Sequence, residues 1–280
     1  CFFCFNPNQE DFAYWCERPF PWRRQLDDLA AEPGSPACIA LTGGEPLLMA
    51  DEAVAFFSRA SELFPAAHLR LYTSGDLLSR ELIDRLVRAG LHEIRFSVKQ
   101  DDKPELLEKV LERMAWAREQ VPTVMVEMPV IPGTDSFMKE LLAKLDALGV
   151  DGVNLLEFAY AMWNWPVFES LGLTLRNPPQ QVVFDYTYAG ALAVQDSEED
   201  CLRLMLWARE QGLGLALHYC SLENKHRAQV RNMNEPFADI HACYAFDYDD
   251  FFLKTALAFD GDRDLVRRAL EREGCHQVLE

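Results

Sequence analysis

The stretch LVRAGLHEIRFSV, residues 86–98, contains the pattern that decides the fold of this chain. A helical run ends at Gly90, because glycine is the residue that most often follows the last turn of a helix, and a β-type run begins almost at once. Five further runs read as continuous apolar strands, at residues 37–42, 68–74, 123–130, 151–158 and 213–220. Helix-period segments lie between them. Buried strands that are each followed by a crossover helix predict a parallel sheet covered by helices.

The repeats predict an α/β fold of the barrel type. Five βα repeats and a sixth strand, without a switch point, fit a partial (β/α)6 TIM-type barrel better than a doubly wound sheet. Residues 159–196 break the repeat with aromatic and proline-rich sequence, which indicates an insertion or a lid, or a long connection packed on the barrel. We therefore expect a core barrel over residues 1–220 and a C-terminal extension over 221–280.

Composition and charge narrow the classes of function. The net charge of the 280 residues is -18, with 27 Lys and Arg against 45 Asp and Glu, so nucleic acid is not an expected partner. No apolar run reaches the roughly 18 residues of a membrane-spanning helix, and no signal peptide is visible, so no membrane partner is expected. Eight cysteines fall unevenly along the chain, which favours a reducing compartment over a disulfide framework. We expect a cytoplasmic protein.

Two short motifs carry the candidate chemistry. CFFC (1–4) is a C-x-x-C pair, which could be half of a zinc site, a redox dithiol or part of an iron–sulfur loop. Zinc needs two more ligands, and a redox dithiol usually has small residues or proline between its cysteines. TGGEPLL (42–48) ends the first strand with two glycines, where the backbone can approach a ligand closely. Ligand sites of βα barrels lie at this end of the strands.

CFFC followed by TGGEPLL resembles the radical S-adenosylmethionine (radical SAM) family. That family binds a 4Fe–4S cluster through C-x-x-x-C-x-x-C and holds the methionine amino group of its cofactor on a GGEP motif. The resemblance implies that Cys1 and Cys4 are the second and third cluster ligands, and that Phe3 is the aromatic residue usual before the third. We expect the native gene to encode the first cysteine, and the first strand, upstream of Cys1. The residues implied to position the methionine moiety are Thr42, Gly43, Gly44 and Glu45.

Later segments extend the resemblance as far as residue 158. YTSGDLL (72–78) is similar to a family element after the next strand, which makes Ser74 a candidate cofactor contact. FSVK (96–99) offers Ser97 and Lys99, although an ordinary strand-end lysine is an alternative for the latter. VIPGTD (130–135) resembles a turn whose backbone, around Ile131, lies near adenine, and a simple Pro-Gly turn explains it equally well.

The resemblance implies an activity and its partners. Three thiolates on a four-iron cluster leave one iron open. In the family that iron binds S-adenosylmethionine, which is cleaved reductively to a radical that abstracts hydrogen from a substrate. An external one-electron donor such as flavodoxin or ferredoxin is implied. The substrate is unidentified; a weak likeness to activating enzymes places a protein or peptide among the candidates. Two alternatives stay open, namely a non-catalytic zinc or iron–sulfur module and an unrelated barrel hydrolase or lyase.

Other polar and aromatic residues have two interpretations each. Asn154 and Glu157 could face the barrel mouth, or Glu157 could be a hydrogen-bonded core carboxylate. The segment 217–230, which includes His218, could bind an anionic group or a peptide, or could be a solvated helix start. The aromatic residues Tyr160, Trp163 and Trp165 could line a substrate pocket or fill the core.

The remaining cysteines have two interpretations as well. Cys16, Cys220, Cys243 and Cys275 could bind an auxiliary cluster or be scattered structural cysteines. We expect Cys38 and Cys201 to be buried as small hydrophobic residues.

Overall fold

The computed structural model describes residues 1–8, 12–16, 21–100, 104–178, 192–239, 244–255 and 257–272. The chain forms two compact units. The first comprises Cys1–Pro179 and Ala189–Ser221, and the second comprises Gln180–Tyr188 and Leu222–Glu280. The two motifs, CFFC and TGGEPLL, both lie in the first unit.

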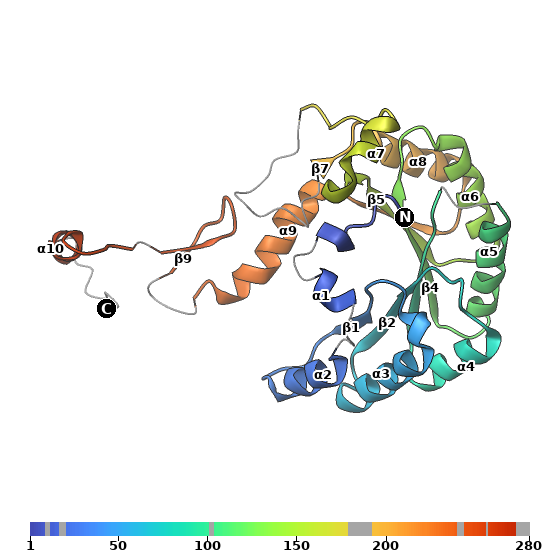
Figure 1. The fold of residues 1–280 in the computed structure, drawn as a ribbon, viewed down its shortest axis with the longest axis horizontal. Helices are drawn as coiled ribbons and strands as arrows, with labels where there is room; N and C mark the ends of the chain where they lie inside the picture. The colour runs from blue at the N-terminus through green and yellow to red at the C-terminus, as the bar shows by residue number, and fades with distance from the viewer. Residues whose placement is uncertain are drawn as a thin grey trace. The chain divides into compact units, whose positions relative to one another are not determined.

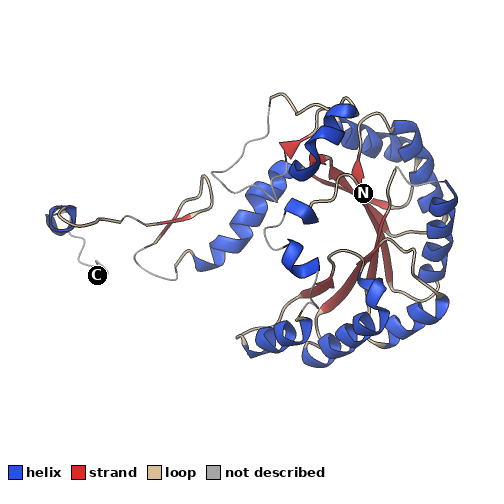
Figure 2. Ribbon diagram, viewed as in Figure 1, coloured by secondary structure: helices blue, strands red, loops and turns tan. Residues whose placement is uncertain are grey.

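A six-stranded parallel sheet forms the centre of the first unit (Figure 2). Its strands are β1 (Cys38–Leu41), β2 (His68–Thr73), β3 (Glu93–Ser97), β4 (Thr123–Val130), β5 (Gly152–Glu157) and β8 (Ala216–Cys220). They lie side by side in the order of the sequence, and every neighbouring pair is parallel. Because each strand is added at the same edge, the sheet has no switch point. The predicted partial barrel is confirmed, with strand boundaries within three residues of those expected.

Helices cover the outer face of this sheet (Figure 1). They are α3 (Ala50–Leu63), α4 (Arg80–Arg88), α5 (Pro104–Arg118), α6 (Asp135–Ala147) and α8 (Ser197–Gln211). Strand residues such as Phe96, Val124 and Leu155 are completely buried in one hydrophobic core with helix residues such as Met114 and Leu142. This burial supplies most of the stability that fixes the strand ends, where a barrel site is built.

Local sequence explains the boundaries of α4 and β3. Ser79 begins the helix, since its hydroxyl accepts a hydrogen bond from the backbone N–H of Leu82 at 3.1 Å. Gly90 ends it with a φ of +99°, a conformation that other residues rarely adopt, and a Cβ there would come within 2.9 Å of Ser61. The chain can therefore turn and enter β3 within three residues.

The two faces of the sheet have different chemistry. In β2, Leu69, Leu71 and Thr73 are buried, whereas the alternate residues His68, Arg70 and Tyr72 are only half-buried. The same alternation occurs throughout β4 and from Ile94 onward in β3, where Glu93 is a buried polar residue. The expectation of continuous apolar strands is therefore wrong for these elements. Only the face packed against helices is apolar, and the opposite, inner face carries polar side chains.

The described part of the 159–196 segment forms short elements and a small core. The elements are β6 (Ala159–Tyr160), η3 (Met162–Asn164), α7 (Trp165–Ser170) and β7 (Leu192–Ala193), which pairs antiparallel with β6. Tyr160 stacks on Trp165 with ring centroids 4.4 Å apart, and Phe168 lies beside them. Residues 179–191 of the expected insertion lie outside the described residues.

The N-terminal region and the second unit supply the other elements. Before β1 lie η1 (Asn6–Asn8), α1 (Phe12–Cys16) and α2 (Trp22–Ala31), and η2 (Pro46–Met49) follows β1. The second unit contains α9 (Leu222–Asn234), η5 (Glu235–Phe237), β9 (Ala245–Phe246), β10 (Leu253–Lys254) and α10 (Asp262–Arg272). Among the described helices, none has the length and apolar character needed to cross a bilayer.

Candidate functional site

The CFFC loop presents two unpaired thiols. Cys1 is exposed, Cys4 is half-buried, and both are free. The backbone N–H of Cys4 donates to the carbonyl of Cys1 at 3.3 Å, so the four residues form a turn. Within the described residues, no group of three or more Cys, His, Asp or Glu is placed to hold a metal ion. The loop thus offers two of the thiolates that an iron–sulfur cluster requires.

Hydrogen bonds from distant residues hold this loop in place. The indole N–H of Trp163 donates to the carbonyl of Cys4 at 2.6 Å, and the amide of Asn164 donates to the carbonyl of Phe2 at 2.9 Å. The Asn8 side chain accepts a hydrogen bond from the backbone N–H of Trp163 at 3.0 Å. Sequence reasoning missed these contacts, because no local pattern connects residues more than 150 positions apart. Trp163 lies against the loop rather than in the core.

One hydrogen bond joins the two motifs directly. The side-chain amide of Asn6 donates to the carbonyl of Gly43 at 3.3 Å. Gly43 has a φ of +133°, so this position requires glycine. Thr42, Gly43 and Gly44 are exposed, and a Cβ added at either glycine would meet no atom within 4 Å. An open surface of backbone therefore lies beside the CFFC turn.

An aromatic cluster covers the other side of the turn. Phe2 and Phe3 contact each other edge to face at 5.1 Å, and both contact Phe158 just beyond β5. Phe168 and Ile131 pack in the same cluster. The structure thus brings together two predicted cofactor contacts, Phe3 and Ile131, that are 128 positions apart in the sequence. The result is an apolar wall next to the cysteines.

Glu45 joins the ends of β1 and β2. Its Oε1 accepts from the hydroxyl of Thr73 at 2.7 Å and from the backbone N–H of Leu47 at 3.1 Å. Its Oε2 accepts from both the backbone N–H and the hydroxyl of Ser74, each at 2.7 Å. Two predicted cofactor residues, Glu45 and Ser74, therefore bond to each other. Their direct role in this structure is to fix the TGGEP loop on the sheet.

The two candidates of the FSVK segment lie at the end of β3. Ser97 is half-buried on the inner face, where it is the register partner of Glu127 in β4. Lys99 is half-buried just beyond the strand, and it makes no hydrogen bond or ion pair with the described part of the chain.

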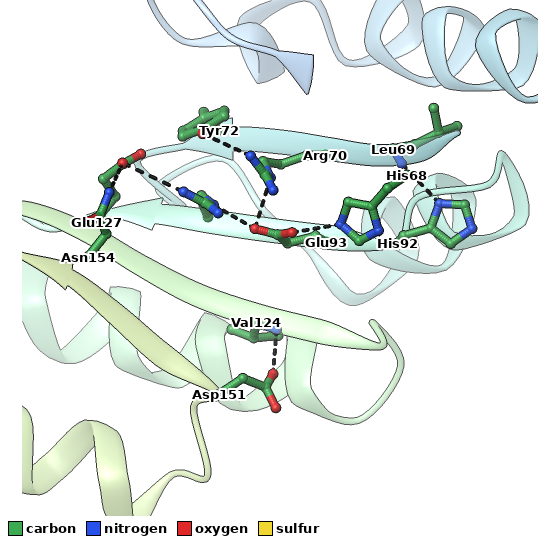
Figure 3. A network of polar contacts seen from close by, with 11 residues as sticks. His68, Leu69, Arg70, Tyr72, His92, Glu93, Val124, Glu127, Asp151 and Asn154 are labelled. Carbon is green, nitrogen blue, oxygen red and sulfur yellow. Dashed lines mark hydrogen bonds and ion pairs between the residues drawn. The ribbon is translucent and has the colours of Figure 1, made fainter. Parts of the chain in front are cut away.

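A polar network crosses the inner face below this mouth (Figure 3). Glu93 accepts hydrogen bonds from Arg95 at 2.5 Å and from His68 at 2.6 Å, and Arg70 lies 2.9 Å from it. Burial raises the pKa of the Glu93 carboxyl, but the hydrogen bonds from Arg95 and His68 and the charge of Arg95 outweigh burial, and the net pKa is lowered. Arg95 also reaches within 3.7 Å of Glu127. The sequence analysis did not predict a role for these charged residues. The alternation of polar and apolar residues within the strands could have indicated a polar inner face.

Glu157 faces the helices rather than the barrel mouth. Its side chain is fully buried and forms an ion pair of 2.9 Å with Arg176, which also pairs with Glu198 at 2.8 Å. The interpretation of Glu157 as a hydrogen-bonded core carboxylate is therefore confirmed. Burial and the nearby Glu157 charge raise the pKa of the Tyr219 hydroxyl and of the Cys201 thiol. This buried group is part of the packing between β5, β8 and α8.

The other cysteines differ in their surroundings. Cys201 is buried, as predicted, but Cys38 is exposed, and that prediction is wrong because β1 is the edge strand of the sheet. Cys220 is half-buried at the end of β8 with a free thiol. Cys243, Cys275 and the side chain of Cys16 lie outside the described residues, so an auxiliary cluster stays a prediction.

Comparisons with known proteins agree with this geometry. The family model of the Radical SAM superfamily matches residues 1–145. A protein of Methanocaldococcus jannaschii, provisionally named as a glycyl-radical enzyme activating enzyme, is 25% identical over 239 residues, which are 82% of this chain and 59% of that protein. The chain thus spans less than two thirds of that relative.

Solved structures share the fold at low sequence identity. Streptococcus suis SuiB bound to its precursor peptide SuiA has a TM-score of 0.56 and 12% identity, covering 78% of this chain and 45% of that chain. SuiB bound to S-adenosylmethionine has a TM-score of 0.53 and 14% identity, covering 78% and 47%. Coproporphyrinogen III oxidase from Escherichia coli, a radical SAM enzyme, has a TM-score of 0.50 and 12% identity, covering 75% and 49%.

Proposed function

This chain belongs to the radical SAM superfamily, whose enzymes use a 4Fe–4S cluster and S-adenosylmethionine, and from this premise we propose how its own residues serve that chemistry. Bound together, the two groups supply reductive cleavage of the cofactor's sulfonium and abstraction of hydrogen from a substrate. We assign Cys1 and Cys4 as cluster ligands. Two observations support this assignment: both thiols are free, and both lie on one turn. The single observation that carries the proposal is the hydrogen bond of Asn6 to Gly43, which sets the cysteine turn beside the glycine loop.

The residues around the turn have separate roles toward the cofactor. The exposed backbone of Thr42, Gly43 and Gly44 offers carbonyl groups to the methionine ammonium. Glu45 and Ser74 hold that loop in shape through their mutual hydrogen bonds.

Contacts to the rest of the cofactor come from the neighbouring strands. The apolar wall that contains Phe3 and Ile131 suits a flat aromatic base. Ser97 and Lys99, at the end of β3, would hold polar groups of the cofactor, and Lys99 has a charge suited to a carboxylate.

The substrate that fits these observations best is a protein or peptide. The relative from Methanocaldococcus jannaschii is named as an activating enzyme, and the SuiB structure contains a precursor peptide. An external one-electron donor protein, such as a flavodoxin or ferredoxin, supplies the reducing electron. We assign the expected core barrel, residues 1–220, to this chemistry and the remainder, residues 221–280, to a C-terminal extension.

The test is cofactor cleavage by the protein expressed from its complete gene. The protein is reconstituted anaerobically with iron and sulfide, reduced with dithionite and mixed with S-adenosylmethionine, and 5′-deoxyadenosine is measured by chromatography. We expect cleavage that is lost in Cys4→Ala together with the bound iron. Cys38→Ala, which removes an exposed thiol outside the site, is the matched control and should keep both. A protein that holds its cluster and binds S-adenosylmethionine without cleaving it would instead be a binding module.

A further inference from the structure

Three polar side chains form a continuous relay across the inner face of the sheet. Glu127, Asn154 and His218 are register partners on the adjacent strands β4, β5 and β8. The Nδ2 of Asn154 donates to Oε1 of Glu127 at 2.5 Å, and the Oδ1 of Asn154 lies 2.7 Å from Nδ1 of His218. Nη1 of Arg95 also lies 3.7 Å from Oε1 of Glu127. Figure 3 shows the side chains of Glu127 and Asn154 pointing toward each other.

The chemistry of the relay fixes the position of the proton on His218. An ionised carboxylate only accepts hydrogen bonds, so the amide nitrogen of Asn154 must face Glu127. The amide oxygen must then face His218, and an amide oxygen also only accepts. Nδ1 of His218 therefore carries a hydrogen, and in the neutral imidazole Nε2 is left as an acceptor with a lone pair.

That lone pair is open to a ligand. His218 is exposed, although Asn154 beside it is only 8% exposed. Nε2 has no hydrogen-bond partner among the described residues of the chain. The residue lies on the inner face, opposite the helices. Holding one tautomer at an exposed histidine has no evident use for folding, because water would satisfy either ring nitrogen.

We propose that His218 is a substrate-binding residue of the barrel, and that Glu127 and Asn154 are the positioning residues that keep its Nε2 ready to accept a hydrogen bond. The ligand group is an N–H or O–H donor, and a peptide backbone amide is the form that matches a protein or peptide substrate. The identification of the ligand as a substrate rests on the proposed function. The state of the imidazole does not.

The tautomer is measured directly by long-range ¹H–¹⁵N correlation spectra of the ¹⁵N-histidine-labelled chain, at a pH of about 8, above the ordinary histidine pKa of about 6.5. Two other histidines serve as internal references for the opposite tautomer. His92 accepts the backbone N–H of Leu69 on its Nδ1 at 3.1 Å, and His68 faces Glu93 with its Nε2 at 2.6 Å. We expect the Nδ1–H pattern for His218 alone among these three. An Nε2–H pattern at His218 would overturn the proposal.

Variants of Asn154 and Glu127 test whether these residues set the tautomer of His218, independently of any effect on folding. Asn154→Leu should convert His218 mainly to the Nε2–H tautomer and leave His92 unchanged. If Asn154→Leu does not fold, Glu127→Gln gives the same information, because an amide can donate or accept and no longer fixes Asn154. We expect a mixture of tautomers in Glu127→Gln. Glu119→Gln, on an exposed pair with Arg80, is the matched control and should leave His218 as in the native chain.

Ligand binding is tested with two small amides that differ in one hydrogen. N-Methylacetamide has the N–H of a peptide bond, and N,N-dimethylacetamide lacks it. We expect a saturable shift of the His218 Nε2 resonance with the first and a much smaller shift with the second, and loss of the difference in Asn154→Leu. Equal responses would overturn the binding role. Because these spectra require no cofactor cleavage, failure of the proposed function would appear separately, as absence of 5′-deoxyadenosine with the tautomer intact.

Discussion

Glu45 shows how a motif residue can act at a distance from the ligand. Its two carboxylate oxygens accept four hydrogen bonds from Leu47, Thr73 and Ser74. A carboxylate that accepts these four hydrogen bonds can affect cofactor binding without contacting the cofactor. It closes the loop after β1 onto the end of β2, and the loop then presents the backbone of Gly43 and Gly44.

At the scale of this residue, Glu45→Ala leaves four donors without their acceptor. We expect the free energy of unfolding to fall by about 1–3 kcal/mol, and the affinity for S-adenosylmethionine, measured by calorimetry, to fall with it. Glu119→Ala is the control, because an exposed ion pair contributes less than about 1 kcal/mol. Unchanged stability in Glu45→Ala, with weakened binding, would instead place the carboxylate on the cofactor.

At the scale of the element, η3 holds the cysteine turn. Trp163→Phe keeps an aromatic ring but deletes the N–H that donates to the carbonyl of Cys4. The loss of one such bond is worth about 0.5–1.5 kcal/mol, so we expect reconstituted protein to release iron to a chelator several-fold faster. Trp116→Phe, on the outer helix α5, should release iron at the native rate. Equal rates in all three proteins would show that the indole hydrogen bond is not needed and that the other contacts of the turn hold it in place.

Local signals predicted the elements, but not the contacts between distant ones. Gly90 and Ser79 mark the ends of α4 in the sequence itself, so the order of strands and helices could be predicted. TGGEP and CFFC could be recognised because each motif consists of a few consecutive residues. Contacts such as that of Asn164 with Phe2 form only when the folded barrel brings distant residues together, and no periodic pattern in the sequence predicts them. The relay to His218 likewise depends on strand register, which the sequence does not state.

At the scale of the whole molecule, the inner-face network links stability to pH. The pKa of Glu93 is lowered from about 4.5, since hydrogen bonds from Arg95 and His68 outweigh the opposing effect of burial. A carboxyl with a lowered pKa in the folded state stabilises the fold above its unfolded pKa of about 4.5, and that contribution is lost as the pH falls through the lower, folded value. The negative charge of Glu93 thus helps to hold β3 to β2, and protonation in acid removes that charge.

We therefore expect urea denaturation to show a steeper loss of stability in the native chain than in Glu93→Gln as the pH falls below the unfolded glutamate pKa of about 4.5. The amide cannot be ionised, so Glu93→Gln loses stability at neutral pH and the two curves converge in acid. Glu62→Gln, whose carboxylate is 69% exposed, should follow the native curve. Parallel curves for the native chain and Glu93→Gln would mean that Arg70 and Arg95 find other partners, and that acid sensitivity arises elsewhere in a chain with 45 acidic residues.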